Sequence, residues 1–150
     1  MNILWNAKSF NELTVDELHD LLRLRTDVFV VEQACAYAEI DGRDPAAIHI
    51  LGRTTQGDLI ACARILPPDD HGLPHVGRVV VRADRRGHGI AGDLMQFALQ
   101  ELQRAHGSRR SELAAQAHLE KFYERFGYAR QGPDYPWDGI PHVDMRRDAD

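Results

Sequence analysis

A strand, a glycine turn and a helix follow one another between residues 78 and 102, and this order constrains the fold more than any other stretch. Three consecutive valines, Val79 to Val81, predict a buried strand. Gly87 and Gly89 follow in an arginine-rich turn, and a long amphipathic helical pattern begins after them. Free backbone N–H groups at a helix start bind anions, and glycine lets the backbone approach a ligand closely. We therefore predict an anion site at this turn.

Three kinds of ligand bind to turns of this type. A P-loop ends in Gly-Lys-Ser or Gly-Lys-Thr, and the absence of lysine from this turn argues against ATP or GTP. The dinucleotide fingerprint is matched literally by Gly87-x-Gly89-x-x-Gly92, but it needs an acidic residue at the end of the second strand. Glu112 falls near the start of that strand instead. The third pattern, a pyrophosphate turn, is matched by Arg86-x-x-Gly89-x-Ala91.

A glycine turn that merely starts a helix is the simpler interpretation of the same residues. The local charge favours the anion site, because the chain as a whole is acidic while the turn is basic. Four basic residues surround the turn: Arg82, Arg85, Arg86 and His88.

The composition limits the class of protein. The chain has 150 residues, enough for a substantial core, and we expect one domain over residues 1–150. Its net charge of −5 argues against general nucleic-acid binding. No apolar run of about 18 residues predicts a membrane span, and the N-terminus lacks the features of a signal peptide. A cytoplasmic location without membrane or nucleic-acid partners is the default expectation.

The two cysteines, Cys35 and Cys62, have no spacing typical of a metal site or of a disulfide framework. Cys62 lies in an apolar run and is expected in the core. Cys35 lies in a polar segment, where we expect it to be exposed, and a nucleophilic role for it is disfavoured. No spacing of histidine, cysteine and carboxylate residues predicts a metal ligand set.

The order of predicted elements gives an α+β fold with one mixed sheet. Thr14 and Glu17 form a capping-box signature at the start of the first helix. A single βαβ unit occurs, which argues against a doubly wound fold. The aromatic segment 132–139 is predicted as a loop. The predicted strands are 3–5, 47–53, 59–66, 75–82, 112–116, 128–131 and 141–147, and the predicted helices are 14–31, 87–106 and 118–126.

Two separated motifs resemble the GNAT acetyltransferase superfamily. The first is Arg86-x-x-Gly89-x-Ala91 after the valine strand, which resembles motif A of these enzymes. The second is the segment 122–128, Phe-Tyr-Glu-Arg-Phe-Gly-Tyr, which is similar to the family pattern Leu-Tyr-x-x-x-Gly-Phe. Residues 25–33, with Asp41-Gly42 following, and the segments 116–119 and 138–142 resemble the ElaA-like subgroup. The resemblance implies a three-layer α/β/α fold around a central mixed, mostly antiparallel sheet.

The resemblance also implies acetyl-CoA as co-substrate, no metal, and a role for each matching position. The strand backbone would bind the pantetheine arm and the thioester carbonyl through Val79, Val80 and Val81. Tyr123 would be the general acid that protonates the leaving thiolate. Gln116 stands where many members have asparagine, and its longer amide leaves the contact with CoA open. The pyrophosphate would be wrapped by Arg86, Gly87, His88, Gly89, Ile90, Ala91 and Gly92.

Acyl transfer to an amine also needs a group that removes a proton from the amine. Four residues are candidates for this base, and a chain of waters is another: Glu32, Asp41, His49 and His142. Each has a simpler structural interpretation, such as a Glu32 ion pair with Arg25 or a hydrogen-bonded histidine in the sheet for His49. Tyr123, likewise, has the alternative of a half-buried aromatic residue on an amphipathic helix.

The acceptor side is less defined in the sequence. Arg64 lies in an otherwise apolar strand, where it either pairs with an acid or points to the solvent face. Tyr135, Trp137 and Tyr37 are candidates for the wall of an acceptor pocket, although packing of the turn explains them equally well.

These observations predict an N-acetyltransferase that transfers an acetyl group from acetyl-CoA to a primary amine by direct transfer in a ternary complex. The acceptor is a small molecule, peptide or protein. The main alternative is a non-catalytic acyl-CoA-binding sensor or regulatory domain, and a nucleotide-binding oxidoreductase is a weaker one. A looser likeness of the N-terminus to acyl-homoserine lactone synthases leaves transfer of longer acyl chains open. The oligomeric state is also open, a homodimer included.

Overall fold

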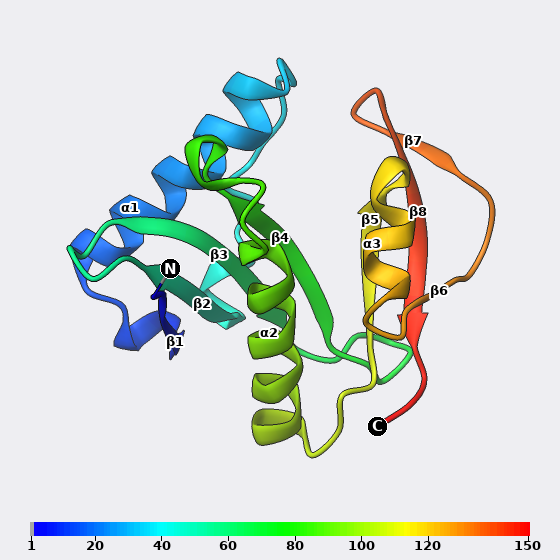
Figure 1. Ribbon diagram of the computed structural model, residues 1–150. Helices are drawn as coiled ribbons and strands as arrows, with labels where there is room; N and C mark the ends of the chain where they lie inside the picture. Colours follow the sequence, from blue (N-terminus) through cyan, green and yellow to red (C-terminus); the bar gives the residue numbers. More distant parts are fainter. Residues whose placement is uncertain (1) are drawn as a thin grey trace.

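One mixed sheet organises the chain, as Figure 1 shows for the computed structural model, which describes residues 2–150. Within these residues the strand order is β1-β2-β3-β4-β5-β8-β6, with β7 paired to β8. The expected α+β architecture is therefore confirmed. The strands are β1 (Leu4–Ser9), β2 (Ile48–Arg53), β3 (Leu59–Leu66), β4 (His75–Val81), β5 (Ser111–Gln116), β6 (Ala129–Arg130), β7 (Tyr135–Trp137) and β8 (Ile140–Arg147).

The pairing between β4 and β5 differs from every other pairing in the described sheet. These two strands run parallel and share one register pair, His75 with Glu112, while the other pairs of strands are antiparallel. Beyond that pair, β4 stays hydrogen-bonded to β3 and β5 stays bonded to β8. The two halves of the sheet therefore diverge, and the facing edges of β4 and β5 keep backbone groups without a partner strand.

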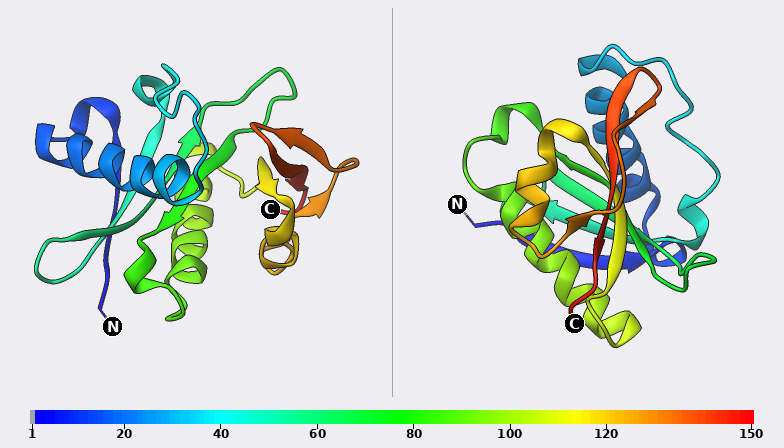
Figure 2. Two further views of the ribbon diagram at one scale, coloured as in Figure 1. Left: turned by 90° about the horizontal axis from the view of Figure 1, so that it is seen from above. Right: turned by 90° about the vertical axis from the view of Figure 1, so that its right-hand side faces the viewer.

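Helices cover both faces of the sheet. The side view in Figure 2 places α1 (Val15–Thr26) on the opposite face from α2 (Ile90–His106) and α3 (Glu120–Glu124). Each face has its own core. Leu21, Leu24 and Val28 pack against one side of β2 to β4, whereas α2 and α3 pack on the other side. Along β4, Val80 belongs to the α1 side and Val81 to the α2 side, as the alternation of strand side chains requires.

The capping-box signal at the start of the first helix was correct, whereas the predicted start of the second helix was not. Thr14 accepts from the Glu17 N–H and the Glu17 side chain accepts from the Thr14 N–H, so the predicted capping box caps α1. The second helix pattern predicted a start at Gly87, but α2 begins at Ile90 because Gly87 and Gly89 have φ of +83° and +76°. Left-handed residues of this kind cannot continue an α-helix.

Other predicted elements were also wrong in extent, among them the first strand, which was predicted over 3–5 and runs over Leu4–Ser9. The first helix ends at Thr26 and continues as a π-helical segment, Asp27–Glu32, for which the apolar spacing gave no signal. The third predicted helix is divided into a 3₁₀ turn, Ala117–Leu119, and the short α3. Segment 132–139 contains β7, which pairs with β8 through a two-residue turn, Asp138-Gly139, with φ of 51° and 78°. Asp-Gly is a strong hairpin signal that the loop prediction overlooked.

Among the described residues, no helix is long and apolar enough to cross a membrane.

Candidate active site

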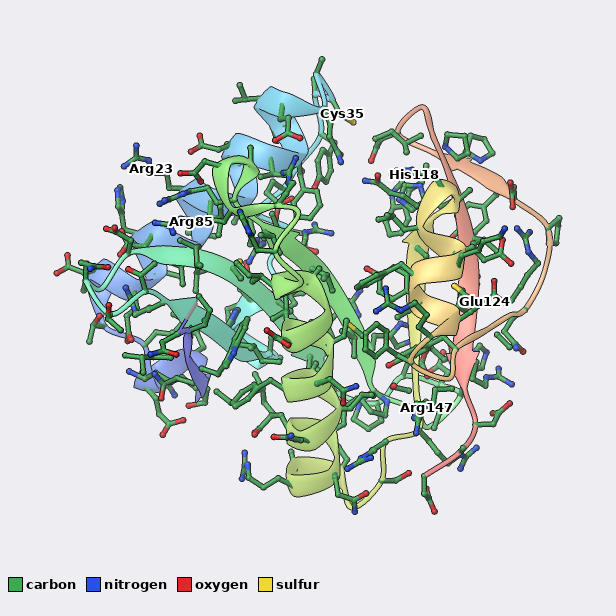
Figure 3. The ribbon with its side chains drawn as sticks, in the orientation of Figure 1. Arg23, Cys35, Arg85, His118, Glu124 and Arg147 are labelled. Carbon is green, nitrogen blue, oxygen red and sulfur yellow. The ribbon has the colours of Figure 1, made fainter. Side chains whose placement is uncertain are left out.

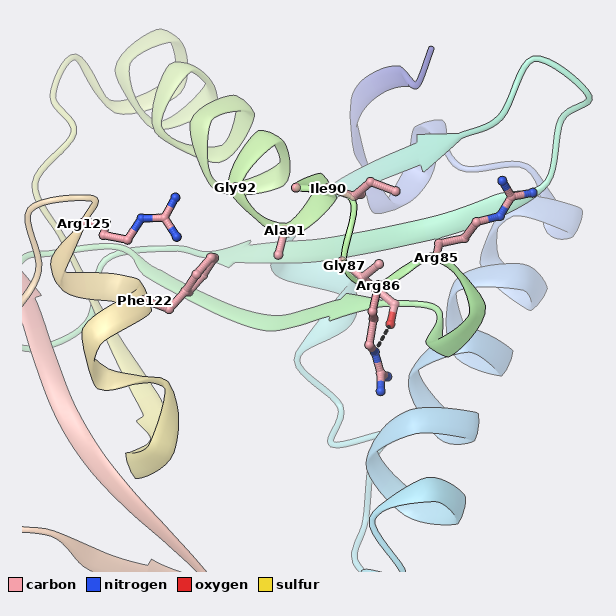
Figure 4. A pocket seen from close by; sticks show the side chains of 10 residues that line it. Arg85, Arg86, Gly87, Ile90, Ala91, Gly92, Phe122 and Arg125 are labelled. Atoms are coloured by element: carbon pink, nitrogen blue, oxygen red, sulfur yellow. Dashed lines mark hydrogen bonds between the residues drawn. The ribbon is translucent and has the colours of Figure 1, made fainter. Parts of the chain in front are cut away.

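A cavity of about 170 Å³ lies where the glycine turn meets α3 (Figure 4). It contains the residues that the sequence assigned to a pyrophosphate site except His88, and of the other residues assigned to CoA it contains Val81 but not Val79, Val80 or Gln116. Its walls are Val81, Arg85, Arg86, Gly87, Gly89, Ile90, Ala91, Gly92, Phe122 and Arg125. The structure thus brings β4, the turn, the start of α2 and α3 together around one hollow.

The backbone of the turn is open to a ligand. A Cβ atom added to Gly87 or Gly89 would meet no protein atom within 4 Å, so the space above both glycines is free. Gly89 is the N-cap of α2, and no side chain caps the helix there. The first N–H groups of α2 therefore point into this space without an intrahelical partner. Together with the helix dipole, they suit a diphosphate group.

Phe122 on α3 and Arg125, the residue that caps its C-terminal end, complete the cavity, and the sequence did not identify either as part of it. Phe122 forms one wall, and the Arg125 guanidinium lies 5.7 Å from the centres of the Phe122 and Phe126 rings. Residues three apart on a helix share a face, and this spacing was the available signal for Phe122 and Arg125. The rim of the cavity thus carries cationic side chains from both the turn and α3.

A β-bulge in β4 faces the gap between β4 and β5. On β3, Cys62 pairs with Val80 and Arg64 pairs with Gly77. One residue of β3, Ala63, therefore lies opposite two residues of β4, Arg78 and Val79. Arg78 has φ of 50°, an uncommon conformation for a residue with a side chain. Bulges of this kind redirect the backbone groups of a strand. Here they alter the β4 edge that faces β5.

Tyr123 lies on α3, directly behind the Phe122 wall. It is 7% exposed and packs edge-on against Phe122 and Tyr128, with ring centres 5.0 and 6.4 Å away. Burial raises the pKa of its phenol well above the ordinary value. Two described side-chain atoms are fully buried without a hydrogen-bond partner, Nε of Arg64 and Nε of Arg147. The Tyr123 hydroxyl is not one of them. This phenol keeps its proton at neutral pH.

Glu32 pairs with Arg86, not with Arg25. Its two carboxylate oxygens lie 2.6 and 3.0 Å from Nη1 and Nη2 of Arg86, and the Arg86 Nε donates to the Val81 carbonyl at 3.0 Å (Figure 4 shows the latter bond). The hydrogen bonds from Arg86 lower the pKa of Glu32. The π-helical segment is thereby connected to the glycine turn through a partly exposed ion pair.

Three arginines and three carboxylates form a network between α1, β3, β4 and the segment after the π-helix. Arg25 lies 2.6 Å from Glu39 and 2.8 Å from Asp44, and it is 2% exposed. Arg64 is 3% exposed and pairs with acids, so the solvent-facing alternative for it was wrong. The members are Arg25, Arg64, Arg78, Glu39, Asp41 and Asp44.

This network makes two of the base candidates unsuitable. Hydrogen bonds from Arg64 lower the pKa of Asp41 far below its ordinary value, so Asp41 binds a proton poorly near pH 7. His49 is 2% exposed, and its Nε2 is 2.9 Å from the Asp44 carbonyl oxygen. Burial lowers the pKa of His49, which favours a neutral ring held within the sheet.

Comparison with known proteins agrees with this geometry. The pattern of the "Acetyltransferase (GNAT) domain" family matches residues 19–149. The chain belongs to the GNAT acetyltransferase family. It is 42% identical to Protein ElaA of Escherichia coli over 98% of this chain and 97% of that protein. The crystal structure of Escherichia coli ElaA superimposes with a TM-score of 0.90 and 40% identity, covering 98% of this chain and 100% of the other.

A second solved structure points to the same chemistry. An acyl-CoA N-acyltransferase from Pseudomonas aeruginosa has a TM-score of 0.92 and 41% identity to this chain, with 97% and 99% of the two chains covered. GNAT proteins use acyl-CoA and an amine acceptor, so the chain is an acyltransferase of the ElaA-like subgroup.

The other side of this GNAT fold brings polar and aromatic residues together near the diverging ends of the strands. Gln116 faces His142 across β5 and β8, and its amide exchanges hydrogen bonds of 3.2 and 3.4 Å with Gln33. The rings of Tyr135 and Trp137 lie 6.3 and 5.4 Å from that of His142. His142 Nδ1 is 2.7 Å from the Ile140 carbonyl oxygen.

The expected exposure of Cys35 was wrong. Cys35 is 9% exposed, and its thiol donates to the Asp138 carbonyl at 3.3 Å, so the segment after α1 contacts the β7–β8 turn. Figure 3 shows Cys35 at the end of that segment. The polar composition around it did not reveal this tertiary contact.

Cys62 is buried as predicted, and burial raises the pKa of its thiol to about 12. The third predicted aromatic residue, Tyr37, donates to Glu39 beneath the Arg78 guanidinium.

Proposed function

We propose that this chain is an N-acetyltransferase that transfers an acetyl group from acetyl-CoA to a primary amine, directly in a ternary complex. One observation carries the proposal: the uncapped start of α2, with open space above Gly87 and Gly89, lies beside cationic side chains at the gap between β4 and β5. We further propose that residues 1–150 act as one domain and that the protein works in the cytoplasm.

The glycine turn would hold the diphosphate of CoA. The backbone N–H groups of Ile90, Ala91 and Gly92 have no intrahelical partner, and they are suited to bind phosphate oxygens. Arg86 would turn from Glu32 towards the phosphates, helped by Arg85 and Arg125 on the rim. His88 belongs to the same turn but does not line the cavity, so its backbone rather than its ring would contribute.

The free edge of β4 would hold the rest of the ligand. The backbone groups of Val79 to Val81 that do not bond to β3 would face the gap, because β5 has left the pairing there, and one of them, the Val81 carbonyl, accepts from Arg86. A thioester supplies an activated acyl group when the co-substrate is bound. A fixed N–H group near the bulge would stabilise negative charge on the acyl oxygen. Gln116 lies across the gap and would contact the same arm through its amide.

Tyr123 would donate the proton that the leaving thiolate needs. Its raised pKa keeps the phenol protonated until transfer, and Tyr123 directly follows Phe122, which lines the cavity, without lining it itself. A Tyr hydroxyl and a thiolate have comparable basicity in water, so transfer between them is chemically reasonable. A general acid of this kind typically accelerates a reaction by about 10²- to 10⁴-fold.

His142 would remove the proton from the amine, directly or through water. Histidine is the side chain that most often serves as a general base, and this ring lies beside those of Tyr135 and Trp137. Tyr135 and Trp137 would form the wall of the acceptor pocket. Glu32, also proposed as a base from the sequence, fits better as the partner of Arg86, since an ionised carboxylate in that pair has a lowered pKa.

Release of free thiol from acetyl-CoA, measured with a panel of primary amines, tests this function. We expect turnover by the wild-type protein, and a loss of about 10²-fold or more in kcat for Tyr123→Phe with nearly unchanged affinity for acetyl-CoA. Tyr128→Phe is the matched control, because the Tyr128 hydroxyl is hydrogen-bonded to Ser111 within the core.

A wild-type protein that binds acetyl-CoA but releases no thiol with any amine would contradict the enzyme and support the sensor. Faster turnover with a longer acyl-CoA than with acetyl-CoA would instead contradict the proposed donor.

A further inference from the structure

Four metal-ligating side chains converge at the closed end of the gap between β4 and β5. Asp69 and His71 lie in the loop before β4, His75 begins β4, and Glu112 is in β5. Figure 1 shows this loop beside the start of β5, at the end of the sheet away from the glycine turn. Within residues 2–150, His75 with Glu112 is also the register pair that joins β4 to β5. Sequence spacing gave no metal prediction because the strand carrying Glu112 follows a whole helix.

Both imidazoles face the same two carboxylates. His71 Nδ1 lies 3.3 Å from Glu112 Oε1 and 3.9 Å from Asp69 Oδ2. His75 Nε2 lies 2.5 Å from Asp69 Oδ2 and 3.6 Å from Glu112 Oε2. The other oxygen of Asp69, Oδ1, accepts the backbone N–H of His71 at 2.8 Å, which turns Oδ2 towards the rings. The loop conformation thus turns Asp69 Oδ2 towards both rings, while the two rings approach different oxygens of Glu112.

The separations are suited to a small metal ion. Ligand atoms of Asp69, His71 and Glu112 all lie within 4.8 Å of one another, and His75, which contacts Asp69 and Glu112 but lies outside this set, would shift its ring to become the fourth ligand. Around a tetrahedral Zn²⁺ with bonds of 2.0–2.2 Å, donor atoms are roughly 3.3–3.6 Å apart. Two of the four measured contacts, 3.3 and 3.6 Å, already have this spacing. The His75–Asp69 contact would open by about 1 Å to admit the ion.

Charge and exposure also favour a cation. The two carboxylates carry two negative charges, and the Arg146 guanidinium, 3.3 Å from Glu112 Oε1, offsets one of them. The side chains of His71 and His75 are 66% and 32% exposed, so an ion can enter from solvent. Mixed nitrogen and oxygen donors suit Zn²⁺ better than Mg²⁺ or Ca²⁺, which prefer oxygen alone.

We propose that Asp69, His71, His75 and Glu112 bind one divalent transition-metal ion of the Zn²⁺ type. The ion would tie the β3–β4 loop and the first residue of β4 to β5. Its role is structural: it would fix the point from which the two halves of the sheet diverge. The site is remote from the glycine turn and independent of the proposed acyl transfer.

Calorimetric titration of EDTA-treated, dialysed protein with ZnCl₂ tests the site. We expect one Zn²⁺ per chain with a dissociation constant in the micromolar range or below. At about 100-fold excess over that constant, the melting temperature should rise by roughly 5–10 °C. Co²⁺ should give the visible absorption of a four-coordinate ion, and Mg²⁺ should leave the melting temperature unchanged.

Two variants locate the ion. His71→Gln and Glu112→Gln should each weaken Zn²⁺ binding by tenfold or more, and His71 is an exposed loop residue whose loss leaves the fold intact. His19→Gln removes an exposed histidine on α1 and should bind as wild type. No Zn²⁺ binding by the wild type, equal binding of Mg²⁺, or wild-type affinity in His71→Gln would overturn the proposal. None of these results depends on turnover of acetyl-CoA.

Discussion

Replacement of Asp44 by asparagine tests how the arginine–carboxylate network holds the N-terminal half of the chain. Asp44 Oδ1 accepts hydrogen bonds from Arg25 at 2.8 Å and from Arg64 at 3.0 Å, and Oδ2 accepts from Arg25 at 3.2 Å. Its side chain is 6% exposed. Asp44→Asn keeps the shape but leaves three arginines facing two carboxylates, and it turns an N–H₂ group towards guanidinium donors.

The expected cost follows from the burial of the unpaired charge. Removing one partner of a buried ion pair destabilises a protein by about 3–5 kcal/mol. For a chain of this size each kcal/mol lowers the melting temperature by about 2–4 °C, which gives a decrease of roughly 6–20 °C. The backbone carbonyl of Asp44, which is bonded to His49, is unchanged by the substitution, so the loss reports on the carboxylate alone.

Equilibrium unfolding in urea, followed by far-UV circular dichroism, measures this cost. Asp84→Asn is the matched control, because Asp84 forms a 2.6 Å ion pair with Arg82 but its side chain is 63% exposed. We expect Asp44→Asn to lower the urea midpoint clearly and Asp84→Asn to leave it in place. Equal, small effects of both substitutions would refute the view that the buried network stabilises the fold.

Three further predictions concern the network and the glycine turn. The pKa values of Asp41 and Asp44 are lowered in the folded state. For Asp44, burial opposes ionisation but Arg25 and Arg64 outweigh it. The stability that these carboxylates contribute is therefore present above about pH 4 and is lost as the pH falls further. When the pH is lowered, the urea midpoint of Asp44→Asn should decrease less than that of the wild type. Glu32→Gln should tighten CoA binding by about 1.5- to 5-fold, since it frees Arg86 from a partly exposed pair; a large loss of kcat in an amine assay would instead indicate a base. Gly89→Ala and Gly72→Ala both force a side chain into a left-handed conformation and should each cost about 1–2 kcal/mol in urea unfolding, but only Gly89→Ala should also weaken acetyl-CoA binding in calorimetry. Equal acetyl-CoA affinity in the two alanine variants would count against the turn as the binding site.

Features with a local cause were the ones that the sequence predicted well. The capping box at Thr14 needs only residues three apart, and the end of α2 needs only Gly107, whose φ of 72° stops the helix. The glycine turn belongs to this class too, because the backbone freedom of Gly87 and Gly89 is a property of those residues. The α+β architecture followed from the order of such local signals.

Features that depend on distant partners were missed or left open. Arg25 reaches Glu39 and Asp44, and Arg64 reaches Asp41, across contacts that no periodicity encodes. The pairing of Glu32 with Arg86 likewise joins residues 54 positions apart. Sequence reasoning therefore supplied the candidates, while the fold decided which of them meet.

The backbone conformation at Arg78 is likewise a feature that the sequence did not predict. Three valines following it predict a regular strand, yet β4 bulges at Arg78 and Val79. The unfavourable φ of Arg78 is accompanied by a 2.8 Å ion pair with Glu39, a residue in a distant segment. The conformation of the strand edge beside the gap thus depends on tertiary contacts.

Calorimetric titration of the wild-type protein with acetyl-CoA, with NADH as the competing ligand in a parallel titration, tests the central claim most directly. We predict saturable binding of one acetyl-CoA per chain and no measurable binding of NADH. Absence of acetyl-CoA binding, or tighter binding of NADH, would contradict the assignment of the glycine turn to the CoA diphosphate.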